Sequence, residues 1–146
     1  MKNLIKNIAL GIALANATSA LAGRADAADL TVEVKNIRVA EGNIMIAVYN
    51  KADAFLSEEG MMVGMKLPAK TDGVSHTFTG LDAGTYAVSV FHDLNADGEL
   101  DSNFLGIPKE PVGMSRDARG KFGPPKFKDA AFKLAVEGGN EKIYLN

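Results

Sequence analysis

"VSHTFTGLDAGTYAVSVFHD", residues 74–93, carries the clearest secondary-structure signal in the chain. Apolar and polar side chains alternate on both sides of "GLDAG", as in two strands joined by a tight turn. Pairing Phe78 with Val88 puts both apolar sets on one face and leaves residues 82–84 as the loop, with Gly84 where a left-handed residue is favoured. The stretch therefore predicts a β-hairpin whose second strand directs three side chains into a core: Tyr86, Val88 and Val90.

Other short apolar stretches predict more strands, at residues 30–37, 43–50, 130–136 and 142–146, with a weaker one at 61–68 that Gly64 interrupts. The short turns "EGN" and "EGGN" are typical of hairpin connections. One short helix is expected over residues 52–60, with Asp53 as its cap. The pattern predicts an all-β fold: an antiparallel β-sandwich or barrel of about seven strands, with a long ordered Gly- and Pro-rich loop.

The first 22 residues have the features of a signal peptide. Lys2 and Lys6 precede the apolar residues 8–17, and "SALA" at 19–22 supplies the small residues before a cleavage point. A later cut, up to Ala28, fits as well, and an uncleaved anchor is the alternative. The apolar segment is too short to span a bilayer, which favours cleavage. We expect a periplasmic or secreted protein with a single domain at residues 29–146.

Composition narrows the function classes. The chain has no cysteine, so no disulfide can stabilise the exported fold. Its formal charge is −2, and loss of the two lysines in residues 1–22 makes it −4. A mildly acidic chain without an overall basic patch argues against nucleic acid as a partner. No later apolar stretch is long enough for a membrane span.

Residues 93–126 depart from the strand pattern, because they hold four of the five prolines and show no periodicity. Loops of this length in compact domains are usually functional or disordered. This one keeps many apolar side chains, which a disordered linker would lack. We expect it to be ordered and packed across one end or face of the sandwich, with these apolar residues: Phe104, Leu105, Ile107, Val112, Met114 and Phe122.

The loop begins with the spacing of a calcium site, D-x-N-x-D-G-x-x-D. Calcium takes six to eight oxygen ligands, and alternating acids can wrap around it. The candidate ligands are Asp93, Asn95, Asp97, the backbone carbonyl of Glu99, and Asp101. Position twelve is Phe104 instead of a bidentate Glu, so water or Glu110 would have to complete the shell, and binding would be weak. A metal-free polar turn is the alternative, since Asn, Asp and Gly also favour turns.

Two other functions deserve comparison. A hydrolase would use His92, Asp93 and Ser115, but no nucleophile-elbow pattern is present and neighbouring strand residues face opposite ways. Copper handling in the periplasm would use the soft sulfurs of Met61, Met62 and Met65. The hairpin register above would place His76 and His92 diagonally on one face of the hairpin. Packing explains the same methionines and histidines equally well.

The motif L-x-x-G-x-Y followed by an alternating strand resembles transthyretin-like and carboxypeptidase-regulatory-like sandwiches. More narrowly, H-D-x-N-x-D-G-x-L-D, G-I-P-K-E-P and F-G-P-P together resemble the bacterial DUF2141 family of exported proteins. The resemblance implies a small exported β-sandwich and transfers no mechanism. We therefore expect a non-enzymatic binding or accessory module whose long loop recognises an envelope or extracellular protein, a glycan or a small molecule.

Overall fold

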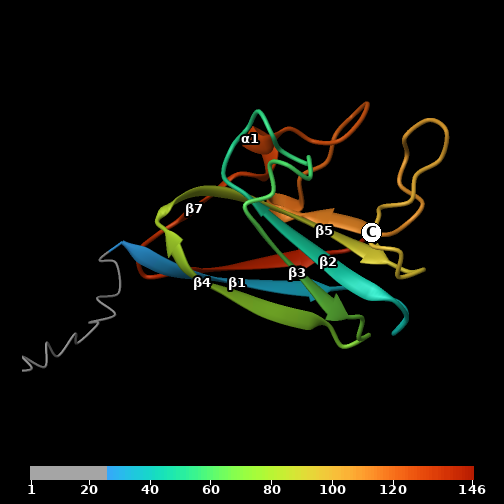
Figure 1. The fold of residues 1–146 in the computed structure, drawn as a ribbon, viewed down its shortest axis with the longest axis horizontal. Coiled ribbons are helices and arrows are strands. Elements are labelled where there is room, and N and C mark those ends of the chain that lie inside the picture. Colours follow the sequence, from blue (N-terminus) through green and yellow to red (C-terminus); the bar gives the residue numbers. More distant parts are fainter. Residues whose placement is uncertain (1–25) are drawn as a thin grey trace, which may run out of the picture.

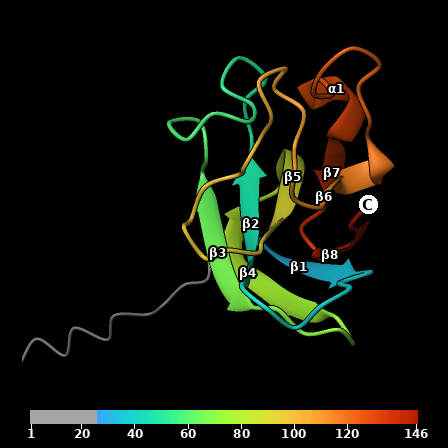
Figure 2. The ribbon, with the colours of Figure 1, turned by 90° about the vertical axis from the view of Figure 1, so that its right-hand side faces the viewer.

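The computed structural model describes residues 26–146, which form two β-sheets packed face to face (Figures 1 and 2). One sheet has the order β4-β1-β8. The other has the order β3-β2-β5-β6, and β7 pairs with the start of β5. The strands are β1 (Ala27–Lys35), β2 (Asn43–Tyr49), β3 (Val63–Pro68), β4 (Val74–Asp82), β5 (Gly84–Asp93), β6 (Val112–Met114), β7 (Phe132–Leu134) and β8 (Gly139–Tyr144). The predicted β-sandwich is confirmed, with eight strands. The predicted signal peptide lies outside the described residues.

The core lies between the sheets and is built by alternation along the strands. Every second residue of β1 is buried from Ala28 to Val34, and β2 follows the same pattern from Ile44 to Val48. Tyr86, Val88 and Val90 of β5 are buried as predicted. Each such aliphatic side chain stabilises the fold by about 1.5–3 kcal/mol when fully buried. Since the chain has no disulfide, this packing is the main source of stability.

The predicted hairpin at residues 74–93 is wrong, because β4 and β5 belong to different sheets. Phe78 pairs with Leu30 of β1, and Val88 pairs with Val48 of β2. The connection between β4 and β5 therefore crosses from one layer to the other. The Tyr86 hydroxyl donates a 2.6 Å hydrogen bond to the Asp82 carbonyl, which fixes this corner. Such a bond resembles the tyrosine corner of other sandwiches.

Other predicted connections also cross between layers. β1 and β2 lie in opposite sheets, so "EGN" does not close a hairpin. β8 runs parallel to β1, with Leu30 opposite Gly139, and β7 pairs with β5 instead of β8. The weak strand at residues 61–68 is real as the edge strand β3. Inward-facing patterns were therefore easier to predict than strand partners.

The short helix expected over residues 52–60 is absent, and this segment is a series of turns. Leu56 has φ 65°, which a right-handed helix does not allow. The Ser57 hydroxyl donates to the Ala54 carbonyl and accepts from the Gly60 amide, which closes a compact turn instead. In residues 26–146, the α-helical segment is α1 (Phe127–Ala130), preceded by the 3-10 turn η1 (Ser115–Asp117).

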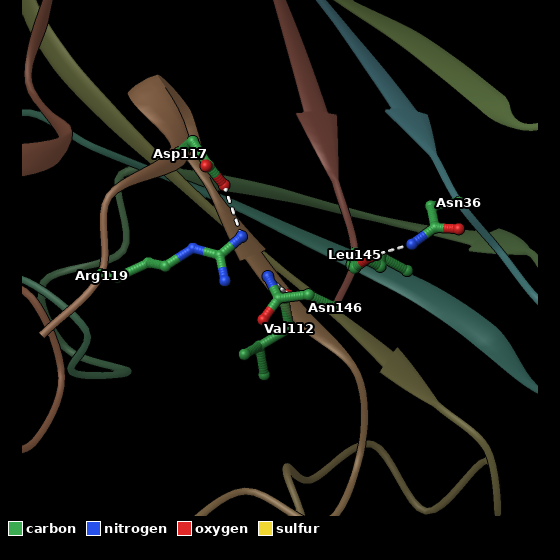
Figure 3. A network of polar contacts seen from close by, with 6 residues as sticks. All are labelled: Asn36, Val112, Asp117, Arg119, Leu145 and Asn146. Atoms are coloured by element: carbon green, nitrogen blue, oxygen red, sulfur yellow. Dashed lines mark hydrogen bonds and ion pairs between the residues drawn. The ribbon is translucent and has the colours of Figure 1, made fainter.

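The C-terminal residues tie the two sheets together (Figure 3). The backbone and side-chain amides of Asn146 both donate to the Val112 carbonyl of β6 at 3.1 Å. The Leu145 amide donates to the Lys35 carbonyl, and the Asn36 side-chain amide donates to the Leu145 carbonyl. Leu145 itself is buried in the core. The chain end therefore joins the end of β1 in one sheet to β6 in the other.

Candidate functional site

Asp93 ends β5 and starts the acidic loop, which we define as residues 93–101. Its side chain is fully buried. One carboxylate oxygen accepts the Asp97 amide at 3.2 Å, and the other accepts the Gly98 amide at 2.9 Å. Gly98 has φ 84°, so glycine suits the point where the chain reverses. Hydrogen bonds to a charged acceptor are strong, and these two fold the loop back on the strand end.

The other predicted ligands meet at Asn95. Its Nδ2 donates to a carboxylate oxygen of Asp97 at 3.1 Å and to one of Asp101 at 2.8 Å. Its Oδ1 accepts the Asp97 amide at 3.3 Å, while Asp97 also accepts the Glu99 amide at 2.9 Å. An amide donor therefore lies between the two carboxylates. Within residues 26–146, no three His, Cys, Asp or Glu side chains are grouped as the ligands of a metal ion would be.

Glu110 holds the base of the loop. Its side chain is nearly fully buried, and its two carboxylate oxygens accept the amides of Leu94 at 2.9 Å and Asp101 at 3.1 Å. One side chain thus joins the start and the end of the acidic loop. The sequence indicates Glu110 only as a supplementary calcium ligand, because contacts from a carboxylate to distant backbone amides leave no local pattern.

Beyond the acidic loop the chain forms a small hairpin, which we call the tip hairpin, residues 102–109. Ser102 and Pro108 pair as an antiparallel bridge, and the Asn103 amide donates to the Ile107 carbonyl at 2.9 Å. The Asn103 side-chain oxygen accepts the amides of Leu105 and Ile107 at 2.9 and 3.0 Å. The backbone of the turn is therefore well bonded within itself.

The apolar side chains of this turn face solvent, contrary to the expected packing. Phe104 is 95% exposed, Leu105 69% and Ile107 55%. Val112 and Met114 are half-buried in β6, as the expectation required. The bridge between Ser102 and Pro108 closes the turn that carries these exposed residues. Exposed large apolar side chains that gather on one loop often mark an interaction site.

A second loop follows β6 and η1 in the same long segment. We call residues 118–128 the basic loop. Phe122 at its centre is fully exposed. At its end, the Phe127 ring packs edge-to-face on Phe55, with the ring centroids 5.7 Å apart. Phe55 packs on Tyr49 in the same way, with a centroid separation of 5.2 Å. A shallow hollow of about 400 Å³ lies between this anchor and residues 52–56.

Both loops project to the same side of the molecule. In Figures 1 and 2, which differ by a quarter turn about the vertical axis, the tip hairpin and the basic loop rise at the top. The turns at residues 36–42 and 69–73 lie lower in both views, and Gly42 approaches the backbone of Asp93 and Leu94 at the start of the acidic loop. The tip hairpin and the basic loop together contain five Lys or Arg and no Asp or Glu: Lys109, Arg119, Lys121, Lys126 and Lys128. Acidic residues lie directly beside both loops, because Asp117 pairs with Arg119 at 3.1 Å (Figure 3), Asp129 follows Lys128, and Asp101 precedes the tip hairpin.

The three residues considered for a hydrolase each form hydrogen bonds with backbone groups. The buried Ser115 hydroxyl donates to the Ala130 carbonyl at 2.6 Å and accepts the Val88 amide at 2.9 Å. The buried His92 ring lies 2.6 Å from the Glu41 carbonyl through Nε2. Asp93 is engaged by the amides of the acidic loop. The three side chains thus have separate partners.

The histidine arrangement considered for copper does not form. His76 lies on β4 and His92 on β5, in different sheets, so they do not share a hairpin face. His76 packs edge-to-face on Phe78 at 4.7 Å. Met61 and Met62 are partly exposed, and Met65 packs against the core. Failure of the predicted β4–β5 pairing removes the geometric reason for a shared site.

The fold and the loops define a small β-sandwich that presents an ordered polar loop and two apolar tips on one side. The chain belongs to the DUF2141 family, described as uncharacterised protein conserved in bacteria, whose model matches residues 32–143. The matched range includes the acidic loop, the tip hairpin and the basic loop. No match was found among curated proteins or solved structures. In residues 26–146, no helix has the length and hydropathy needed to cross a membrane.

Proposed function

We propose that this protein is an exported, non-enzymatic binding or accessory module that contacts its partner through the tip hairpin and the basic loop. The observation that supports this most directly is the exposure of Phe104 at the tip of a well-bonded turn. A rigid apolar tip loses little conformational entropy on binding, which favours recognition. The sandwich serves as the scaffold for these loops.

Site-specific photo-crosslinking in the native host tests this function. A benzophenone amino acid at Phe104 should crosslink to an envelope component after irradiation. The same group at Val39 is the matched control, because Val39 is an exposed apolar residue outside the tip hairpin and the basic loop. Identical crosslinking patterns at both positions, or none at either, would contradict recognition through the tip hairpin.

Export is the second part of the proposal. Ala27 and Ala28 begin β1, and Ala28 is buried against the core. A cut after Ala28 would remove paired residues from the strand, whereas a cut after Ala22 would leave it whole. We therefore expect the processed chain to start at Gly23. Intact-mass measurement of protein from the native host checks this, and a start at Met1 would refute export with cleavage.

We also propose that calcium binds weakly in the acidic loop and stabilises the module. The Asp97 and Asp101 carboxylates converge on the Asn95 amide, at contacts of 3.1 and 2.8 Å. Rotation of that amide by half a turn would replace its NH2 donor with an oxygen acceptor, which is the kind of ligand that calcium prefers. Among the described residues, no Lys or Arg forms an ion pair with these carboxylates. A cation would relieve their repulsion.

A further inference from the structure

We propose that the outer edge of β4 pairs with the same edge of a second copy of the chain and forms a two-fold symmetric dimer. The two β4 strands run antiparallel, with His76 at the axis and Ser75 opposite Thr77 of the second copy. This pairing joins the β4-β1-β8 sheets of the two copies into one continuous sheet. The surface contains no residue of the tip hairpin or the basic loop, so the inference goes beyond the function proposed above and does not depend on it.

The outer edge of β4 has unpaired backbone groups. β4 is the outermost strand of its sheet and pairs with β1 alone (Figures 1 and 2). Within the described part of the chain, the backbone of residues 74–79 bonds to no other strand or loop. Every second residue of an edge strand points its amide and carbonyl groups outward. Such a row of groups is completed by another extended strand, as in β-strand addition.

The other sheet edges carry features that hinder pairing. The edge strand β3 contains Lys66 and Pro68, and both residue types protect natural edges. β6 covers the end of β8, where a Cβ on Gly113 would lie 2.7 Å from the Tyr144 carbonyl. β6 and β7 have three residues each. Residues 74–81 of β4, in contrast, contain no proline, Lys, Arg, Asp or Glu.

The register follows from the regular part of β4. Gly80 has φ 72°, and the pairing with β1 shifts beside it, so the regular ladder ends at Phe78. A two-fold axis places each residue opposite a fixed partner in the other copy. When His76 lies on the axis, residues 74–78 pair completely with themselves. Val74 then faces Phe78, and Ser75 faces Thr77, which are favourable cross-strand pairs.

Charge does not oppose this pairing. The charged side chains nearest to the edge lie on β1 or at the ends of β4: Asp29, Glu33, Lys35, Lys70, Asp72 and Asp82. The two β1 strands would be three strand spacings apart, about 14 Å, which exceeds the Debye length in physiological salt. Each end of the paired segment brings one lysine together with two aspartates, a net charge of −1. Both signs therefore meet at each end.

Apolar side chains beside the edge add to the interface. β6 and β8 meet on one side of the sandwich, so β3 and β4 are the outer strands on the other side, where residues 69–73 join them. Val63, Met65 and Leu67 of β3 and Val74 of β4 are half-buried at this rim of the core. A ladder of five residues is marginal by itself. The two-fold brings the rims of both copies together and covers their apolar side chains.

Sedimentation velocity on protein purified from the native host tests the dimer. The mass should rise from one copy toward two between about 1 and 100 µM. Thr77→Lys places two like charges near the axis, so the dissociation constant should rise at least about tenfold. Thr77→Val is the matched control, because it removes the same hydroxyl without adding charge. Urea midpoints confirm that each variant is folded.

Disulfide trapping tests the register. The chain has no cysteine, so single substitutions report single contacts. An equimolar mixture of Ser75→Cys and Thr77→Cys chains should form the mixed disulfide in preference to either symmetric one, because these positions face each other across the interface. Lys66→Cys on the edge of β3 should stay unlinked under the same oxidation.

The outcomes decide between occupants of the edge. A chain that stays monomeric at about 100 µM would overturn the proposal. So would a dimer that Thr77→Lys leaves intact, or one that Phe104→Ser abolishes, since the latter assigns the contact to the tip hairpin. A benzophenone amino acid at Thr77 that crosslinks to a different envelope protein would assign the edge to a strand of that protein instead. Crosslinking from Phe104 bears only on the proposed function, so the two ideas can fail separately.

Discussion

Glu110 is the side chain on which the geometry of the loop most depends. It is nearly fully buried and accepts one backbone amide with each carboxylate oxygen. Glu110→Gln keeps the size of the side chain, but its NH2 group would face the backbone amide of Leu94 or of Asp101, and two donors cannot form a hydrogen bond. We expect a loss of about 1.5–3 kcal/mol in the free energy of unfolding, as for hydrogen bonds to charged groups. Urea denaturation measures the loss.

The control for this variant is Glu99→Gln, because Glu99 is exposed in the same acidic loop. It should change stability by less than about 0.5 kcal/mol. Hydrogen exchange gives a second readout, since the amides of Leu94 and Asp101 should lose protection in Glu110→Gln. Equal effects of the two substitutions would show that Glu110 does not hold the loop.

Calcium binding in the acidic loop can be tested by its effect on stability. If calcium at ten times its dissociation constant occupies the acidic loop, stability should rise by about 1.4 kcal/mol. Thermal melts with millimolar calcium and with chelator measure the difference. Asp97→Ala should abolish it, because Asp97 bonds both to Asn95 and to the Glu99 amide. A shift that survives in Asp97→Ala would place any ion elsewhere, and no shift at about 5 mM would leave a metal-free turn.

Glu141 on β8 makes stability depend on pH. Burial raises the pKa of its carboxyl above the ordinary 4.5, and the nearby Arg116 offsets part of that rise. The folded state therefore holds the proton more tightly than the unfolded state, and stability falls as pH rises from about 4.5 through the raised pKa. Glu141→Gln removes this loss, so the variant should gain stability relative to the parent as pH increases.

Urea denaturation between about pH 4 and pH 7 measures this gain. The carboxyl keeps much of its contact with water, so we expect a change below about 1 kcal/mol. Glu137→Gln, on the exposed turn before β8, controls for the removal of one negative charge. A gain that does not grow with pH, or that matches the control, would contradict the role given to Glu141.

At the scale of the secondary-structure elements, the connection from β4 to β5 differs most from the prediction, because it crosses between the sheets and does not close a hairpin. The Tyr86 hydroxyl bonds to the Asp82 carbonyl at 2.6 Å across this corner. Tyr86→Phe removes only that bond, and we expect a loss of about 1 kcal/mol. Tyr144→Phe is the control, because the Tyr144 side chain is exposed on β8. Urea midpoints should fall for the first variant alone; equal midpoints would mean that the bond contributes nothing net.

The same corner explains what the sequence could predict about the fold. Alternation identified Tyr86, Val88 and Val90 as core residues, because burial depends on the face of a strand. It did not identify their partners. A hairpin and a crossing between layers both turn the apolar residues of two strands toward each other, so the local pattern is the same. The partner of Phe78 depends on β1, more than forty positions away.

At the scale of the whole molecule, some features of the loops could be predicted from local spacing and others could not. The spacing of Asp93, Asn95 and Gly98 indicated a compact turn, because Asp93 and Asn95 accept amides a few positions away and Gly98 donates one of these. No local pattern indicated that Glu110 would accept amides from both ends of the acidic loop. It also suggested that Phe104 would pack, since large apolar residues are usually buried. Exposure is a property of the complete fold, and no local pattern encodes it.

The parallel pairing of β1 with β8 has a consequence for the order of events during folding. Sequence positions about a hundred apart must meet before the β4-β1-β8 sheet is complete. Contacts between distant segments slow folding, because the chain loses the entropy of closing a long loop before those contacts stabilise it. If the chain is exported N-terminus first, as proposed above, this sheet stays incomplete until β8 has emerged from the membrane. In pulsed hydrogen exchange during refolding, amides shared by β1 and β8 should become protected together, and later than those between β2 and β3.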